Sequence, residues 1–335
     1  MEWDILLDQF FWISVCAAMV RIAAPILMAA LGEVFAEQSG VLNIGLEGMM
    51  LMGAFSGFMG AFLTGNNWLG LLAGMLVGGA LSLILVYMSV NRGVDQVVTG
   101  IAINIFALGV TGFLFSRAFE ITFEPPRIHA FKSWPVPVLS ELSWVGPVLF
   151  RQTPLVYIAL LLVPVCAVVL YRTKFGLKIR AVGEHPLAAD TAGVQVNRIR
   201  FVCILLSGLM AGFGGAILSV GQVDVFLENM TAGRGFIALA VVVFGKWNPF
   251  RVLGAAFLFG LADAFQLRIQ ALGFKIPFQF LLMAPYVLTI VVLVGVVGKA
   301  DYPAATGIPY LIERRRRRAL AGGRWTRGSA KPEGD

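Results

Sequence analysis

Carboxylate and amide side chains occur at helical spacing inside long apolar stretches of this sequence. Asn43 and Glu47 are four residues apart in one such stretch, so on a helix both would lie on one face. A carboxylate is costly in these surroundings unless it faces a partner group or a water-filled cavity. Two interpretations of Glu47 follow. It lines or gates a path for a polar solute, or it lies near the cytoplasmic end and pairs with a neighbouring group.

Two further polar stripes have similar spacing. The stretch 96–112 carries small and polar residues on one helical face, namely Gly100, Asn104, Ala107 and Thr111. Such a stripe suits a translocation path, or close helix packing with an interhelical hydrogen bond. Asp263 and Gln266, three residues apart, form the other stripe. Arg21 is a lone cation in the first apolar run, and Glu47 and Asp263 are the candidates for its counter-charge.

Membrane-spanning helices must position these stripes. Hydrophobic residues make up 58% of the 335 residues, charged residues make up 13%, and the mean hydropathy is +0.83. A soluble chain of this length could not bury so much apolar surface. Because a bilayer core takes about 20 apolar residues per helix, the sequence predicts an all-α, polytopic membrane protein with about nine (eight to ten) transmembrane helices. The expected spans lie near 10–31, 41–64, 68–90, 97–117, 154–171, 200–222, 233–246, 252–268 and 279–298.

The distribution of charge predicts the orientation of the spans. Lys and Arg gather in the connection 172–200 and in the tail 313–335, so both are expected in the cytoplasm. The Pro- and Trp-containing segment 118–153 then lies outside, as a structured interfacial segment. Residues 1–312 are the predicted transmembrane domain, and the basic tail is predicted to be disordered. The net charge of +7 indicates contact with anionic membrane lipid rather than nucleic acid.

The connection 172–200 is the most informative polar stretch. A short helix is predicted from Pro186, with a glycine stop at Gly193. The short apolar span 233–246 is a candidate re-entrant helix. A connection with its own helix flanked by glycines favours docking on another protein over simple packing on the bundle.

The full sequence contains none of the common motifs of enzyme active sites or ATP-binding loops. It contains no GxxxxGK[ST], GxSxG or HExxH pattern, and its three cysteines lie in apolar runs without metal-ligand spacing. Short GxxxG spacings, such as Gly74 with Gly78 and Gly208 with Gly212, are typical of closely packed membrane helices. The chain is therefore expected to be no enzyme, to have no metal or catalytic residue, and to bind no ATP through a P-loop.

Three blocks of sequence carry a resemblance to a known family. The blocks are GEVFAEQSGVLNIGLEGMMLMGAF (32–55), DQVVTGIAINIFALG (95–109) and KFGLKIRAVGEHPLAADTAGV (174–194). Together they resemble permeases of the ribose and branched-chain amino-acid type ABC importers, and most closely the branch associated with BmpA-like lipoprotein receptors and nucleoside uptake. The resemblance covers most of residues 30–300. It implies a multi-pass protein of the bacterial plasma (inner) membrane with a cytoplasmic C-terminus.

The resemblance also implies partners. A second, different permease chain would complete the pore, two cytoplasmic subunits would bind ATP, and an external solute-binding lipoprotein would deliver the solute, so this chain needs no cofactor of its own. The connection 172–200 would couple to the ATPase, and the implied interface residues are Arg180, Gly183, Glu184, Asp190 and Gly193. His185 stands where the family pattern suggests Asn. Transport would proceed by alternating access.

Two alternatives stay open at this stage. The candidate path residues Asn43, Asn104, Thr111 and Gln266 are neutral hydrogen-bonding groups, which suits an uncharged polar solute but does not separate a nucleoside from a sugar. Glu47 and Asp263 could instead be proton-coupling carboxylates of a gradient-driven secondary transporter.

Overall fold

The computed structural model describes residues 8–119, 126–129, 131–137, 139–272 and 302–310, with isolated positions between 279 and 291. Within this part of the chain every regular element is helical, and seven helices are long and apolar enough to cross a membrane. The expectation of an all-α polytopic membrane protein is confirmed. The expected span 279–298 lies mostly outside the described residues, and the tail 313–335 lies wholly outside them.

The seven spans have these bounds: Gln9–Gln38 (α1), Leu46–Thr64 (α2), Asn67–Asn91 (α3 with its π-helical end Val86–Asn91), Gln96–Ala118 (α4), Pro154–Arg172 (α6), Val196–Val223 (α9 with its π-helical end Ile217–Val223) and Pro249–Ala271 (α11). Shorter elements connect them: the 3-10 turn Leu139–Glu141, α5 (Val145–Leu149), α7 (Lys174–Glu184), α8 (Pro186–Thr191) and α10 (Arg234–Phe244). The expected re-entrant helix at 233–246 is therefore an 11-residue helix.

Capping side chains explain where several helices begin. Asp95 accepts hydrogen bonds from the amides of Val97 and Val98 at the start of α4. Asn66 and Asn248 cap α3 and α11 in the same way. A side-chain oxygen at this position satisfies amide groups that have no partner within the helix. Local sequence thus explains where these three helices start, and tertiary packing fixes how the helices lie together.

Glycines bring α2, α3 and α9 into close contact. A Cβ atom placed on Gly78 would lie 2.5 Å from the carbonyl oxygen of Gly208, and one on Gly74 would lie 2.6 Å from that of Gly53. Because lipid provides no hydrophobic drive between helices, such close backbone approach supplies the packing energy. The GxxxG spacings expected to pack helices therefore do so here.

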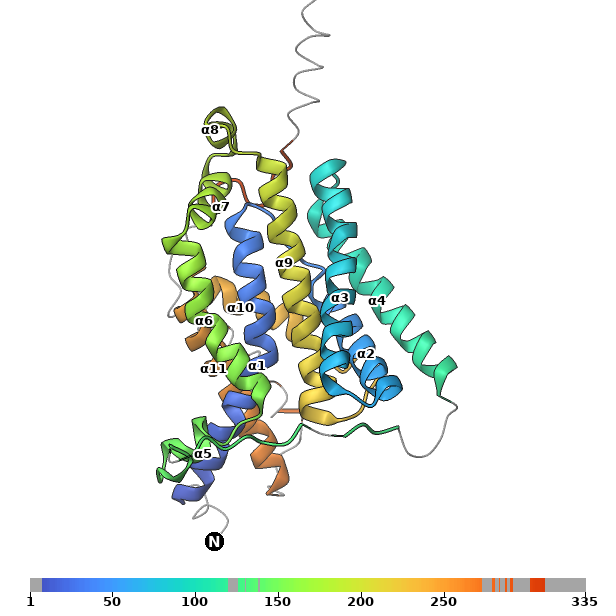
Figure 1. Cartoon of the computed structure of the whole chain (residues 1–335), viewed down its shortest axis with the longest axis vertical. Helices are drawn as coiled ribbons and strands as arrows, with labels where there is room; N and C mark the ends of the chain where they lie inside the picture. The colour runs from blue at the N-terminus through green and yellow to red at the C-terminus, as the bar shows by residue number, and fades with distance from the viewer. Residues whose placement is uncertain are drawn as a thin grey trace, which may run out of the picture.

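The two ends of the bundle differ (Figure 1). The short helices α7 and α8 and the segment 302–310, called the strap below, lie at one end, whereas α5 lies near the N-terminus at the other. At the α5 end, the Gln152 side chain donates to the carbonyl oxygens of Val148 and Ala17, which ties the segment after α5 to α1.

Candidate functional site

Two crossings of the bundle are broken. One is the non-helical connection 39–45 between α1 and α2, and the other is the segment 224–233 before α10. Non-helical backbone is tolerated at membrane depth only where protein or a cavity covers it. In both crossings a helix starts inside the bundle, at Leu46 and at Arg234. Glu47, in the first turn of α2, connects the start of α2 to the start of α10.

The length of α10 gives the depth of this junction. At about 1.5 Å per residue α10 is about 16 Å long. Its far end lies at the α7–α8 end of the bundle, since the indole nitrogen of Trp247 donates to Glu37 Oε2 (2.5 Å) in the last turn of α1. The start of α10 therefore lies about halfway through a hydrocarbon core of about 30 Å.

Both carboxylate oxygens of Glu47 bind the start of α10. Oε1 accepts from the amide of Gly233 (2.9 Å) and Oε2 from the amide of Gly235 (2.6 Å). A carboxylate is favoured here because free amides and the helix dipole both point at it. Gly233 has a φ of +85°, and a Cβ on Gly235 would lie 2.5 Å from the Glu47 backbone, so both positions require glycine. The expected pairing of Glu47 with a neighbouring group is present, and a role of Glu47 in a path stays a prediction.

Asn43 does not share a helix face with Glu47, because α2 begins only at Leu46. That part of the sequence-based prediction is wrong, since Asn43 lies in the broken crossing. Its backbone amide donates to Glu33 Oε1 (2.9 Å), and its side-chain Nδ2 donates to Ser207 Oγ (3.0 Å). Ser207 Oγ in turn donates to Glu33 Oε2 (2.8 Å). All three residues are fully buried, so this network ties α1, the crossing 39–45 and α9 together.

Asn104 holds the other side of the same crossing. Its Oδ1 accepts from the amide of Gly48 (2.8 Å), and its Nδ2 donates to the carbonyl of Ile44 (3.0 Å). Thr111, two turns further along α4, is buried and bonds the carbonyl of Ala107 within its own helix. These bonds match the packing interpretation of the α4 stripe. A role for either residue in a translocation path stays a prediction.

Asp263 and Gln266 lie on α11, and Gln266 is buried. The electrostatic partner of Asp263 is Arg234, at the start of α10. No ion pair joins Arg21 to Glu47 or Asp263 in the part of the chain that the structure describes; Glu47 binds the start of α10, and the nearby charge of Arg268 has the same sign as that of Arg21.

A cavity of about 450 Å³ lies among α1, α6, the end of α9 and α11. Its lining includes polar side chains and one aromatic ring, namely Arg21, Thr153, Gln222, Asp224, Arg234 and Phe131. None of the candidate path residues named from the sequence lines this cavity. Asp224 and Gln222 follow a long apolar run, and this position is the signal that could have identified them.

Helices α7 and α8, called the docking unit below after the docking that the sequence predicts for them, carry an exposed groove of about 690 Å³. Leu177, Ala181 and Ala188 form much of its lining, and Glu184 and His185 lie in it. The expected helix from Pro186 is present as α8, and Gly193 follows it with a φ of +84°. The sequence analysis missed that 174–184 is also a helix, although Thr173 caps it by accepting from the amide of Gly176.

The five residues implied to contact the ATPase differ in exposure. Glu184 and Gly193 are exposed, Asp190 is half-buried, and Gly183 is buried. Arg180 is half-buried with its guanidinium 5.4 Å from the ring centre of Tyr171. Of the five, Glu184 alone is among the groove-lining residues, all of which belong to the described part of the chain.

Arg200 joins the docking unit to the spans. It is 1% exposed, and its guanidinium donates to the carbonyls of Ser39 (3.2 Å) and Ile308 (2.8 Å). The strap connects α7 to the end of α1. The backbone amide of Ala305 donates to the carbonyl of Gly183 (2.8 Å), and the backbone amide of Gly307 donates to the carbonyl of Gly40 (3.2 Å). This set of contacts, the Arg200 junction, links α7, the end of α1, α9 and the strap.

Sequence reasoning missed Glu33, Glu37, Ser207, Trp247 and Arg200. Glu33 and Glu37 are four residues apart in an apolar run, the same signal that singled out Glu47. Arg200 was counted only among the charges that set the orientation. Its burial depends on the strap, which is far away in the sequence.

Comparison with protein families decides the class. Residues 15–297 match the family described as the permease component of branched-chain amino acid transport systems. The chain belongs to this permease family. Its membrane-spanning fold and the sequence without a P-loop agree with a permease component that is not itself the ATPase.

Curated relatives match over most of the permease. The guanosine ABC transporter permease protein NupQ of Bacillus subtilis is 39% identical, covering 92% of this chain and 99% of the relative. The nucleoside ABC transporter permease protein NupC of Lactococcus lactis is 38% identical (89% and 96%). A putative glucose ABC transporter permease protein, TsgC13 of Haloferax volcanii, is 42% identical (76% and 78%). No solved structure matches the chain.

The first two organisms each have a second similar permease. NupP of Bacillus subtilis and NupB of Lactococcus lactis, which carry the same transporter descriptions as NupQ and NupC, are each 25% identical to this chain. The permease thus resembles both members of two pairs, and more strongly one member of each.

Replacing Glu47 by Gln tests the junction at the start of α10. Glutamine keeps one acceptor oxygen but turns an NH₂ group toward a backbone amide, so the change should cost about 1–3 kcal/mol of stability. Hydrogen exchange at the amides of Gly233 and Gly235 should become faster, and the midpoint of thermal unfolding should fall. Glu228→Gln, an exposed carboxylate in the segment before α10, is the control and should change neither. Unchanged exchange in Glu47→Gln would contradict the assignment.

Proposed function

We propose that this permease is one pore-forming subunit of an ATP-driven, binding-protein-dependent importer of nucleosides that works by alternating access. The observation that carries the proposal is the exposed groove of the docking unit, which is joined through the Arg200 junction to α1 and α9. Those two helices also hold the broken crossing 39–45 through Glu33 and Ser207. A partner that moves the docking unit can therefore act on the interior of the bundle.

The proposed partners would supply the ATP-binding site that this sequence lacks and a second permease like those found beside two of the relatives. Two cytoplasmic subunits would bind ATP and dock on α7 and α8, so the docking unit and the C-terminus would face the cytoplasm. The paired relatives NupP with NupQ and NupB with NupC support a second, different permease as the other half of the pore. An external solute-binding lipoprotein would deliver the solute. This chain would carry no cofactor of its own.

A nucleoside is the proposed solute because NupQ and NupC are described as guanosine and nucleoside permeases. The cavity near the start of α10 is compatible with this class, since about 450 Å³ falls within the usual size range of small-molecule sites. The ring of Phe131 can stack with a base, and Asp224 and Gln222 can bind hydroxyl groups. TsgC13, described as a putative glucose permease, makes a sugar the solute to compare.

The proposed mechanism uses the two broken crossings. ATP binding would bring the ATPase subunits together and draw the docking unit with them. The Arg200 junction would pass this movement to α1 and α9, and from there to the crossing 39–45 and the Glu47 contact with α10. Rocking of the two permease chains would then change which side of the membrane the path faces.

Uptake of labelled guanosine, with ribose as the comparison, tests the proposed solute and energy source. Cells that lack this gene should take up less guanosine than cells in which the gene is restored, whereas ribose uptake should be the same in both. ATP depletion should abolish the difference in guanosine uptake. Gene-dependent uptake of ribose alone would contradict the nucleoside assignment. Uptake that survives ATP depletion but stops with a protonophore would contradict the ATP-driven mechanism and support a gradient-driven transporter.

Glu184→Lys tests the docking groove. Reversing an exposed charge in the groove should abolish ATP-driven uptake and release the ATPase subunits on purification, while membrane insertion stays normal. The control is Glu141→Lys, an exposed carboxylate in the 3-10 turn at the opposite end of the bundle, which should leave uptake unchanged. Full uptake in Glu184→Lys would remove the coupling assignment.

A further inference from the structure

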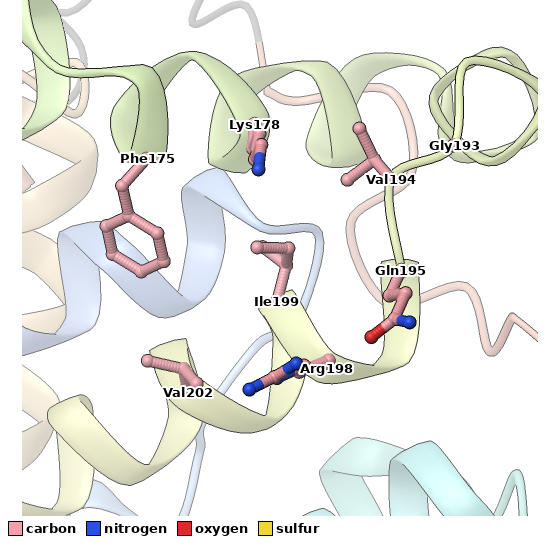
Figure 2. A pocket seen from close by; sticks show the side chains of 8 residues that line it. All are labelled: Phe175, Lys178, Gly193, Val194, Gln195, Arg198, Ile199 and Val202. Carbon is pink, nitrogen blue, oxygen red and sulfur yellow. The ribbon is translucent and has the colours of Figure 1, made fainter.

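A second cavity lies beside the docking groove, between α7 and the start of α9, with a volume of about 430 Å³. Figure 2 shows Lys178 reaching into it from α7 and Arg198 reaching into it from α9. The two cations thus approach one space from different helices. Lys178 and Val194 line both this cavity and the docking groove, so the two lie side by side on α7.

The lining changes character from one end of the cavity to the other (Figure 2). Phe175 and Val202 face each other at one end, Lys178 and Arg198 lie in the middle, and Gln195 lies at the other end. A ligand that fits this order has an apolar part, then an anionic group, then a polar group. Phospholipids with an acidic head group have this order of chemistry.

The two cations are available for such a ligand. Both side chains are exposed, and neither has a hydrogen bond or ion pair with another residue of the described ranges. No Asp or Glu is among the described residues that line the cavity. The positive charge in the cavity is therefore not neutralised by its own walls, which favours an anionic occupant.

The cavity lies where two spans reach the surface of the membrane. The span formed by α6 ends at Arg172, three residues before Phe175, and the span formed by α9 begins at Val196. Phe201 and Val202, in the second turn of α9, are 39% and 37% exposed, as expected for apolar side chains in contact with acyl chains. Basic cavities between membrane helices at this level are suited to anionic head groups. A free phosphate would leave the apolar end unused.

We propose that this cavity binds the head group of an anionic phospholipid, with the phosphate between Lys178 and Arg198 and the first acyl carbons against Phe175 and Val202. The bound lipid would fill the space between the docking unit and α9. The site is separate from the solute path, so the proposal holds whatever the solute is.

Native mass spectrometry of the purified complex, with phosphatidylglycerol or phosphatidylcholine added in detergent, tests this site. The unmodified protein should keep one more phosphatidylglycerol than the double variant Lys178→Gln/Arg198→Gln, and the apparent affinity at this site should fall about tenfold or more, as expected for the loss of two lipid-facing charges. The basic tail is present in every sample, so its contribution cancels. Val202→Trp, which fills the apolar end without a change of charge, should also release the lipid.

The control Arg172→Gln/Arg251→Gln removes two exposed charges of the same sign outside the cavity, and its lipid count should match that of the unmodified protein. Lys178→Arg should keep the lipid, which separates loss of charge from loss of folding. Equal retention of phosphatidylglycerol in the Lys178→Gln/Arg198→Gln variant would overturn the proposal. It would also be overturned if inorganic phosphate displaced the lipid at equal concentration, or if this variant lost the ATPase subunits but kept the lipid.

Discussion

The structure depends on one constraint: backbone groups freed inside a membrane must find partners within the protein. Glu47 meets this constraint for the start of α10, because its two oxygens accept the amides of Gly233 and Gly235 about halfway through the bundle. Asn104 meets it for the crossing 39–45. Without these side chains, both crossings would need to be continuous helices. The polar residues inside the bundle thus stabilise irregular backbone at this depth.

The same crossing is connected to the end of the bundle that carries the docking unit. Glu33 and Ser207 bind it to α1 and α9, and Arg200 joins these helices to the strap and, through the strap, to α7. Glu37 adds a parallel link, since it accepts a hydrogen bond from Trp247 at the end of α10. Buried polar contacts of this kind are costly to break, so these links hold the crossing to the end of the bundle that carries the docking unit. The fold therefore joins a docking surface to two helix starts in its interior.

Sequence reasoning succeeded where the signal is local. Apolar runs of the right length predicted the membrane helices, Pro186 and Gly193 bounded α8, and GxxxG spacing marked the closely packed α2, α3 and α9. It failed for Asn43 because periodicity carries no information on where a helix is interrupted. It also missed Arg200 and the cavity at Asp224, because these depend on segments distant in sequence. The sequence singled out polar residues in apolar runs, but their hydrogen-bond partners could be found only from the three-dimensional structure.

The central claim is that movement of the docking unit reaches the interior through the Arg200 junction. The most direct test is the number of solute molecules taken up per ATP hydrolysed by the complex in proteoliposomes, compared between the unmodified protein and Arg200→Lys. Lysine keeps the charge but cannot bond Ser39 and Ile308 with fixed geometry. We expect ATP hydrolysis to continue while uptake per ATP falls severalfold, with Arg172→Lys unchanged. An unchanged ratio in Arg200→Lys would contradict the account.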